Sequence, residues 1–153
     1  MRSLIVFLDS SVILSGLASP SGGSRKILDA GQKKKLQLVT TPFVIQEVAK
    51  HVSKLDINPD NLKRLLSKKI IRLIPDPPKD LQQKFNKVIS DPDDAPILAG
   101  ATISGASTLV SLDKSHILTQ QVKSSLKPMQ LFSPKEFWQY LEKTLYKKDS
   151  VLQ

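Results

Sequence analysis

The sequence has few or no examples of several residue types, and each shortage excludes a class of protein. None of its 153 residues is cysteine, which excludes a disulfide scaffold or a thiolate zinc site and favours the cytoplasm as the compartment. The longest apolar run, residues 4–8, is far shorter than the roughly 18 residues of a membrane-spanning helix. We therefore expect no membrane segment, and the chain is long enough for one domain with its own core.

The N-terminal segment superficially resembles a secretory signal peptide, because Arg2 precedes an apolar run and small residues follow it. However, Asp9 stands inside the would-be apolar region, where a charged side chain is unfavourable. We therefore interpret residues 4–8 as a buried first strand.

Acidic residues are also scarce, because 14 Asp and Glu stand against 23 Lys and Arg, for a formal net charge of +9. An excess of this size favours an anionic partner, and nucleic acid is the first candidate. The alternative is a solvated lysine-rich surface, which would account for the run Lys33–Lys35. Charge alone leaves both interpretations open.

Short apolar runs alternate with helical patterns, which predicts an α/β domain with a mainly parallel sheet. We expect strands at 4–8, 36–40, 70–74, 107–112 and 129–132, and helices at 11–17, 24–35, 42–55, from 58–61 onward, 80–89, about 95–104, 115–122 and from 134. Ser133 and Glu136 have the capping-box spacing at the start of the last helix. We place one domain at residues 1–146 and a disordered tail at 147–153.

Two aspartates directly follow predicted strands: Asp9 after the first, and Asp113 after the strand at 107–112. Because the carboxyl ends of parallel strands line the ligand crevice, both carboxylates would enter one cleft if these strands are neighbours. Taken singly, each aspartate also fits the N-cap of a helix.

Two further acids lie on predicted helices. Asp94 shares a stripe with apolar residues at i+3, i+4 and i+7 and so faces the packed side, whereas Asp93 faces outward and is the more natural cap. Glu47 lies at the margin of an apolar helix face. Its alternative role is a surface ion pair with Lys50 or His51.

Several carboxylates at close range cannot all stay ionised without a cation. With no cysteine and only two histidines, His51 and His116, oxygen ligands favour Mg²⁺ or Mn²⁺ over zinc. An acidic cleft in a basic protein suits a phosphodiester substrate, because lysines can hold the strand while the ion acts on the scissile phosphate.

Four segments carry these residues in order: FLDSSVILSGL, VIQEVAKH, DPDDAPILAGA and LVSLDKSHI. In this order and at these separations they resemble the PIN domain, a family of metal-dependent ribonucleases that includes many toxins of toxin–antitoxin pairs. The resemblance spans residues 4–132 and implies a Rossmann-like three-layer α/β/α fold with a central, mainly parallel sheet. It places the four acids of the family, with Mg²⁺ or Mn²⁺, at Asp9, Glu47, Asp94 and Asp113.

The function implied is an endoribonuclease that hydrolyses RNA phosphodiesters, with a toxin as its candidate biological role. RNA, an antitoxin protein and a second copy of the chain are its candidate partners. The chain departs from the family pattern twice. Ser10 and Ser11 stand where a Thr-Asn pair is frequent, and Ser115 stands where a further acid is frequent, which puts a second metal ion in doubt.

Two alternatives come from other classes. A PIN fold could be kept for RNA binding or RNA processing with catalysis lost, but the four intact acids argue against this. Phosphate-monoester transfer on a haloacid-dehalogenase-like fold needs a second aspartate where Ser11 stands. A receiver-like fold needs an adjacent acidic pair near the first strand and a late lysine after a strand. Neither pattern is present.

Overall fold

The computed structural model describes residues 4–152, which form a five-stranded parallel sheet with helices on both faces. The strand order is β3-β2-β1-β4-β5. The strands are β1 (Leu4–Leu8), β2 (Leu36–Thr40), β3 (Ile71–Leu73), β4 (Thr108–Val110) and β5 (Gln130–Phe132). The chain leaves β1 in one direction toward β3 and later fills the other side with β4 and β5. The topological switch point, where such folds bind ligands, therefore lies between β1 and β4.

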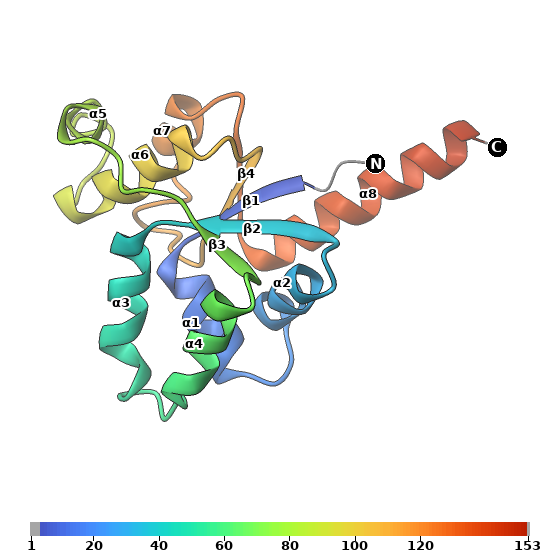
Figure 1. The fold of residues 1–153 in the computed structure, drawn as a ribbon. Coiled ribbons are helices and arrows are strands. Elements are labelled where there is room, and N and C mark those ends of the chain that lie inside the picture. Colours follow the sequence, from blue (N-terminus) through green and yellow to red (C-terminus); the bar gives the residue numbers. More distant parts are fainter. Residues whose placement is uncertain (1–3, 153) are drawn as a thin grey trace.

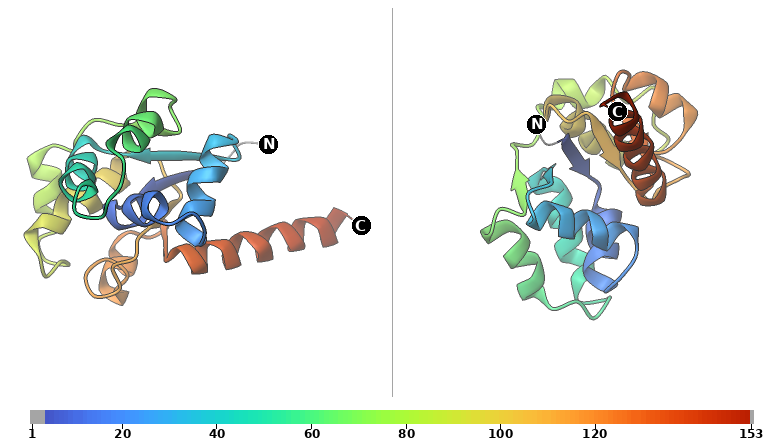
Figure 2. Two further views of the ribbon diagram at one scale, coloured as in Figure 1. Left: turned by 90° about the horizontal axis from the view of Figure 1, so that it is seen from below. Right: turned by 90° about the vertical axis from the view of Figure 1, so that its right-hand side faces the viewer.

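The helices form two layers around this sheet (Figure 1). One face carries α1 (Ser10–Ala18), α2 (Gly23–Gln32), α3 (Pro42–Val52) and α4 (Pro59–Ser67), and the other carries α5 (Lys79–Gln83), the 3-10 turn η1 (Pro92–Asp94), α6 (Ala95–Ile103) and α7 (Gln120–Ser125). Helix α8 (Pro134–Leu152) contacts β5 and α2 and projects beyond the rest of the fold (Figure 2). The predicted three-layer α/β/α fold with a parallel sheet is confirmed.

The core lies at the centre of the sheet. Phe7 of β1 pairs with Val39 of β2 and Leu109 of β4, and all three side chains are fully buried. A strand covered on both faces needs such a continuous apolar run. Gly100 lets α6 approach closely, since a Cβ there would lie 2.9 Å from Thr41 Cγ2 and 3.4 Å from the Phe7 ring. This close packing brings the start of α6 to the carboxyl end of the sheet.

Two predicted helices are shorter than expected. The helix predicted at 24–35 ends at Gln32, because Lys34 adopts a left-handed φ of 60° and donates its N–H to the Gly31 carbonyl. The helix predicted at 42–55 ends at Val52.

The helix predicted at 80–89 is α-helical only over Lys79–Gln83. Beyond it the backbone forms i→i+3 hydrogen bonds, such as Phe85 N–H to Gln82 O at 3.1 Å, and these turns bury the Phe85 ring. Asparagine and the β-branched residues that follow have modest helix propensity, so packing of the phenylalanine decides the local conformation.

The prediction of a helix at residues 115–122 is wrong. Residues 114–119 form turns, and α7 begins only at Gln120. Thr119 is the N-cap of α7, because its hydroxyl accepts the N–H of Val122 at 3.2 Å. The turns themselves are held by Asp113, whose carbonyl accepts the N–H of Leu118 at 2.9 Å.

The predicted capping box at the start of α8 is confirmed. Ser133 N–H donates to Glu136 Oε1 at 2.9 Å, and Glu136 N–H donates back to Ser133 Oγ at 3.2 Å. Helix α8 continues through Leu152, and residue 153 lies outside the described residues, so the domain boundary at 146 stays a prediction. Among the described residues, no helix combines the length and the apolar character that crossing a membrane requires.

Candidate active site

Asp9 lies at the switch point, where β1 ends and α1 begins. Its N–H donates to the carbonyl of Val110 on the neighbouring strand β4 at 3.1 Å. Its side chain is 4% exposed, and its Oδ1 caps α1 by accepting the N–H of Ser10 at 2.8 Å. Its Oδ2 accepts the hydroxyls of Ser111 at 2.6 Å and Ser11 at 3.1 Å. Asp9 is therefore both a helix cap and the buried centre of a polar cluster.

The two serine hydroxyls tie the end of β4 to α1. Ser111 Oγ accepts the N–H of Asp113, and Ser11 Oγ accepts the N–H of Leu112, each at 3.0 Å. A hydroxyl carries one proton, and in both serines this proton is directed at Asp9. This arrangement orients the carboxylate and fixes the loop that carries Asp113.

Sequence reasoning did not single out Ser111, which is fully buried. Its signal is a polar residue at the end of an otherwise apolar strand, two positions before a candidate aspartate. An unpaired hydroxyl would be costly at such a position, so a partner across the sheet could have been expected.

Asp113 follows β4 and is half-buried. Its Oδ1 accepts the N–H groups of Ser115 at 3.1 Å and His116 at 2.9 Å, and the His116 ring Nδ1 lies 3.2 Å from both carboxylate oxygens. Asp113 thus caps the turn after β4 while its position keeps it beside Asp9.

Glu47 reaches the cluster from α3. Its Oε2 accepts the hydroxyl of Ser10 at 3.1 Å, so Ser10 contacts Asp9 through its N–H and Glu47 through its side chain. The alternative ion pair is not formed. His51 Nδ1 lies 2.8 Å from the Glu47 main-chain carbonyl, and the ion pairs among the described side chains do not include Glu47.

Asp94 occupies the N-cap position of α6 without making a side-chain cap hydrogen bond, and it is half-buried. The cap of this segment is Asp91, whose Oδ1 accepts the N–H of Asp93 at 3.0 Å. The predicted capping role of Asp93 is therefore wrong, because η1 inserts one extra turn before α6. Within the described residues, the Asp94 carboxylate has no hydrogen-bond partner.

Electrostatic repulsion links the four acids. Burial, together with the charges of Asp91, Asp113 and Asp9, raises the pKa of Asp94 to about 6. Burial also raises the pKa of Asp9, which serine and backbone hydrogen bonds partly oppose and the Asp113 charge reinforces. The pKa of Glu47 is raised for the same reason, with the Asp9 charge adding to the effect of burial. The cluster stores the repulsion that the sequence predicts.

The side-chain atoms of the four acids that could bind a metal ion are all oxygens. Among residues 4–144, whose side chains the structure describes, no three Asp, Glu or His side chains converge closely enough to enclose a metal ion by themselves. Mg²⁺ is commonly held by one or two carboxylates and keeps several waters. The residues therefore fit Mg²⁺ or Mn²⁺ in their chemistry, but not as a cage made of protein ligands alone.

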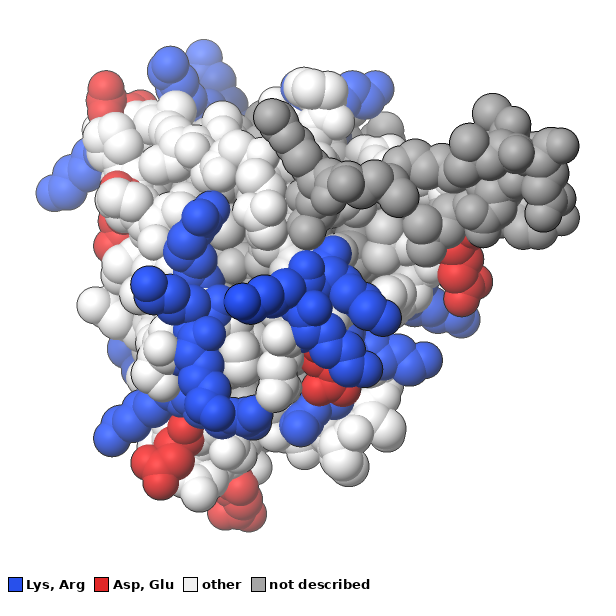
Figure 3. Space-filling model, turned by 45° about the vertical axis from the view of Figure 1, so that its right-hand side comes forward, with Lys and Arg blue, Asp and Glu red and all other residues white. Residues whose placement is uncertain are grey.

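Basic side chains gather at the opposite, amino-terminal end of the sheet. Lys33–Lys35 follow α2, and Lys68 and Lys69 follow α4. Lys34, Lys69 and Arg72 line a shallow groove of about 350 Å³ there. Figure 3 shows lysine and arginine side chains grouped on the face that includes this end.

Comparisons with known proteins agree on the fold. A family profile described as PIN domain matches residues 5–115. Similar solved structures include VapBC2 from Rickettsia felis bound to a DNA fragment from its promoter, with 18% identity, a TM-score of 0.59, and coverage of 85% of this chain and 98% of that chain. PAE2754 from Pyrobaculum aerophilum has 18% identity, a TM-score of 0.60, and coverage of 89% and 94%.

Mycobacterium tuberculosis VapC20, described as a sarcin–ricin-loop-cleaving toxin, has 13% identity, a TM-score of 0.53, and coverage of 72% of this chain and 91% of that chain. At such identities the likeness concerns the fold alone. No curated protein matches the chain.

Proposed function

We propose that this chain, which belongs to the PIN-domain family, is an endoribonuclease that hydrolyses RNA phosphodiester bonds with Mg²⁺ or Mn²⁺. The observation that carries the proposal is the group formed by Asp9, Glu47, Asp94 and Asp113 at the switch point of the sheet, where burial and neighbouring carboxylate charges raise the pKa of Asp9, Glu47 and Asp94. Such repulsion destabilises the protein unless a cation offsets it.

The ion, when bound, would offset the acidic charge, polarise the scissile phosphate and acidify a water molecule. Asp9, Asp94 and Asp113 would hold it, directly or through water. Asp94 gains most from a cation, because its carboxylate has a raised pKa and no hydrogen-bond partner among the described residues. Ser111 and Ser11 would keep Asp9 in one orientation.

Glu47 would either share the ion or orient the attacking water. Burial raises its pKa and so makes its carboxylate a stronger base than that of an ordinary glutamate, and the Ser10 hydroxyl fixes one of its oxygens. The other oxygen remains available to a water molecule.

The test is cleavage of a 5′-labelled single-stranded RNA with Mn²⁺ or Mg²⁺, followed by identification of the product ends. We expect cleavage that EDTA abolishes and that leaves 5′-phosphate ends, because water is the nucleophile. A 2′,3′-cyclic phosphate would mean that the ribose hydroxyl attacked, and it would contradict this mechanism.

The toxin of a toxin–antitoxin pair is the biological role that we propose. The similarity in fold to VapBC2 and VapC20 supports it, and it implies an antitoxin protein as partner and the cytoplasm as compartment. The test is expression with and without the neighbouring small reading frame. Growth arrest that the neighbour relieves would support a toxin, and arrest that it leaves unchanged would contradict an encoded antitoxin there. A homodimer stays a prediction.

A further inference from the structure

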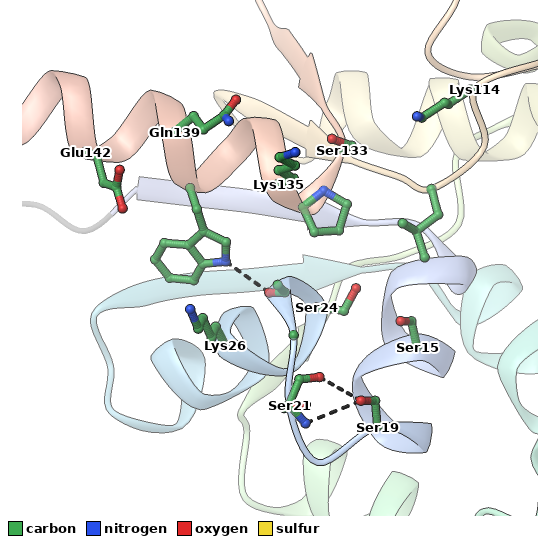
Figure 4. Close-up of a pocket in the computed structure, with 15 residues that line it drawn as sticks. Ser15, Ser19, Ser21, Ser24, Lys26, Lys114, Ser133, Lys135, Gln139 and Glu142 are labelled. Carbon is green, nitrogen blue, oxygen red and sulfur yellow. Dashed lines mark hydrogen bonds between the residues drawn. The ribbon is translucent and has the colours of Figure 1, made fainter.

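A groove of about 720 Å³ lies beside the acid cluster, between the α1–α2 connection and the start of α8 (Figure 4). Its lining combines hydroxyl groups, the indole of Trp138 and three lysines, Lys26, Lys114 and Lys135. Glu142 also lines it, at the end away from Lys114 (Figure 4). Lys114 and Lys135 therefore supply positive charge between Glu142 and the acid cluster, whereas Lys26 lies toward the Glu142 end (Figure 4).

The groove continues directly from the candidate active site. Leu112 and Lys114 line it, and they flank Asp113 in the chain. Helix α1 joins the two places as well, because Ser11 contacts Asp9 and Ser15, one turn later, lines the groove. Four residues of helix rise by about 6 Å, which is comparable with the length of one extended nucleotide.

Ser24 points into this groove from the first turn of α2 (Figure 4). The residue is 5% exposed, and its hydroxyl has no hydrogen-bond partner among the described residues. Where the structure describes side chains, at residues 4–144, no side-chain polar atom is both sealed from solvent and unpaired, so the Ser24 oxygen opens onto the groove. A buried hydroxyl without a protein partner is unusual, and it is available to a ligand.

The connection that carries Ser24 is fixed in place. Trp138 Nε1 donates to the Gly23 carbonyl at 3.0 Å, and Ser19 Oγ donates to the Ser21 carbonyl at 2.7 Å. Gly22 adopts a φ of 99°, which disfavours side chains other than hydrogen. No side chain caps the start of α2, a helix of 10 residues. The first N–H groups of such a helix favour an anion.

We propose that this groove binds the phosphate of a single-stranded RNA nucleotide next to the scissile bond. Lys114 and Lys135 contact the phosphate oxygens, Ser24 donates its hydroxyl, and the half-buried ring of Trp138 offers an apolar surface to the base. The inference rests on the proposed function, because the acid cluster supplies the position of the scissile phosphate. It adds the path of the RNA along the protein surface, which runs from Asp113 along α1 toward α8.

Binding without cleavage tests the groove separately from catalysis. The probe is a fluorescein-labelled 12-nucleotide oligouridylate in EDTA, with fluorescence anisotropy measured from low to moderate salt. The double variant Lys114→Gln/Lys135→Gln should bind RNA about tenfold more weakly or worse. The negative slope of log binding constant against log salt concentration should also become shallower by about 1.4, which is about 0.7 for each lysine–phosphate interaction removed. The matched control, Lys33→Gln/Lys35→Gln, removes the same charge at the far end of the sheet and should stay within about twofold.

The variant Ser24→Ala distinguishes a role in RNA binding from a role in the stability of the fold. Because the hydroxyl has no protein partner among the described residues, its removal should leave the melting temperature unchanged while it weakens RNA binding about threefold or more. A variant that melts earlier and binds as the wild type does would assign Ser24 to the fold and remove it from the site.

The outcomes separate this inference from the proposed function. Groove-dependent RNA binding by a protein that never hydrolyses RNA would keep the groove and refute the nuclease. Metal-dependent RNA cleavage, with groove variants that bind and cleave as the wild type does, would keep the nuclease and overturn the groove. Equal losses in both lysine doubles would also overturn it, because they would reduce the effect to net charge.

Discussion

The two ends of the parallel sheet carry opposite charges, and the charges have different physical origins. At the carboxyl end, acids gather where burial and mutual repulsion make their charges unfavourable, and Asp9 is only 4% exposed. At the amino end, Lys33–Lys35 and Lys68–Lys69 are exposed and follow the C-termini of α2 and α4. Cations at helix C-termini are stabilised by the helix dipole. The first arrangement therefore needs a functional explanation, whereas the fold accounts for the second.

The largest expected effect follows from neutralising the carboxyl end. Asp9→Asn, Asp94→Asn and Asp113→Asn each keep the side-chain shape and remove one charge, and each should reduce RNA cleavage by about 100-fold or more. Initial rates on a labelled RNA with Mn²⁺ measure the reduction. Asp60→Asn, at an exposed position in the first turn of α4, is the control that should keep full activity. An active Asp113→Asn would remove that residue from the site.

Metal-dependent stability is the next largest effect. Ion binding to the folded state alone adds about 2.7 kcal/mol at a free concentration 100-fold above Kd, so Mn²⁺ should raise the melting temperature of the wild type. The increase should shrink in Asp9→Asn and Asp94→Asn and persist in Asp93→Asn, which alters an exposed neighbour. Calorimetry with EDTA and with Mn²⁺ decides this. If all three variants keep the full increase, the acid cluster does not bind the ion.

A smaller effect concerns pH in the absence of metal. The pKa of Asp94 is raised from 3.8 to about 6 in the folded state, so the folded protein binds the proton more tightly than the unfolded chain. This contribution to stability is fully present below about pH 4 and is lost as pH rises through about 6. Because the carboxylate is half-buried and water screens it, we expect a loss of about 1 kcal/mol.

Asp94→Asn lacks this titration and isolates its contribution. The free energy of unfolding of the variant, minus that of the wild type, should increase by about 1 kcal/mol between pH 4 and pH 7 in EDTA. Urea unfolding across this range measures the difference. A difference that stays constant with pH would mean that neither burial nor the charges of Asp91, Asp113 and Asp9 raise the pKa of Asp94.

The sequence signals that single out the four acids are local. Asp9 and Asp113 each follow an apolar strand, and parallel strands place such residues at one edge. Ser111 escapes prediction because its role depends on a hydrogen bond to a residue 102 positions away. Likewise, α7 begins late because Thr119 competes with the turn that Asp113 caps. Contacts between residues distant in the sequence, and competition between two caps, produce no periodic pattern in the sequence from which they could be predicted.

The strands and the ends of the helices differ in how well the sequence predicts them. Apolar runs such as 4–8 must be buried in any compact fold, so their number and order set the topology. By contrast, α2 ends where Lys34 takes a left-handed backbone conformation, a conformation for which glycine is the usual signal. A lysine at this position does not predict a helix end, and the helical periodicity of the sequence continues beyond Gln32, where α2 ends.

The smallest expected effect concerns the amino end. Replacing Lys33–Lys35 with glutamine should lower the free energy of unfolding by only a few tenths of a kcal/mol, because exposed cations in the last turn of a helix interact weakly with its dipole and salt screens them. RNA affinity at moderate salt should change by less than about twofold, since this run lies at the end of the sheet opposite Asp9 and Asp113. Urea unfolding and fluorescence anisotropy at two salt concentrations measure the two quantities. A tenfold drop in RNA affinity would make the amino end a second RNA-binding surface, and the contrast between the two ends would then lie in what each does to the RNA.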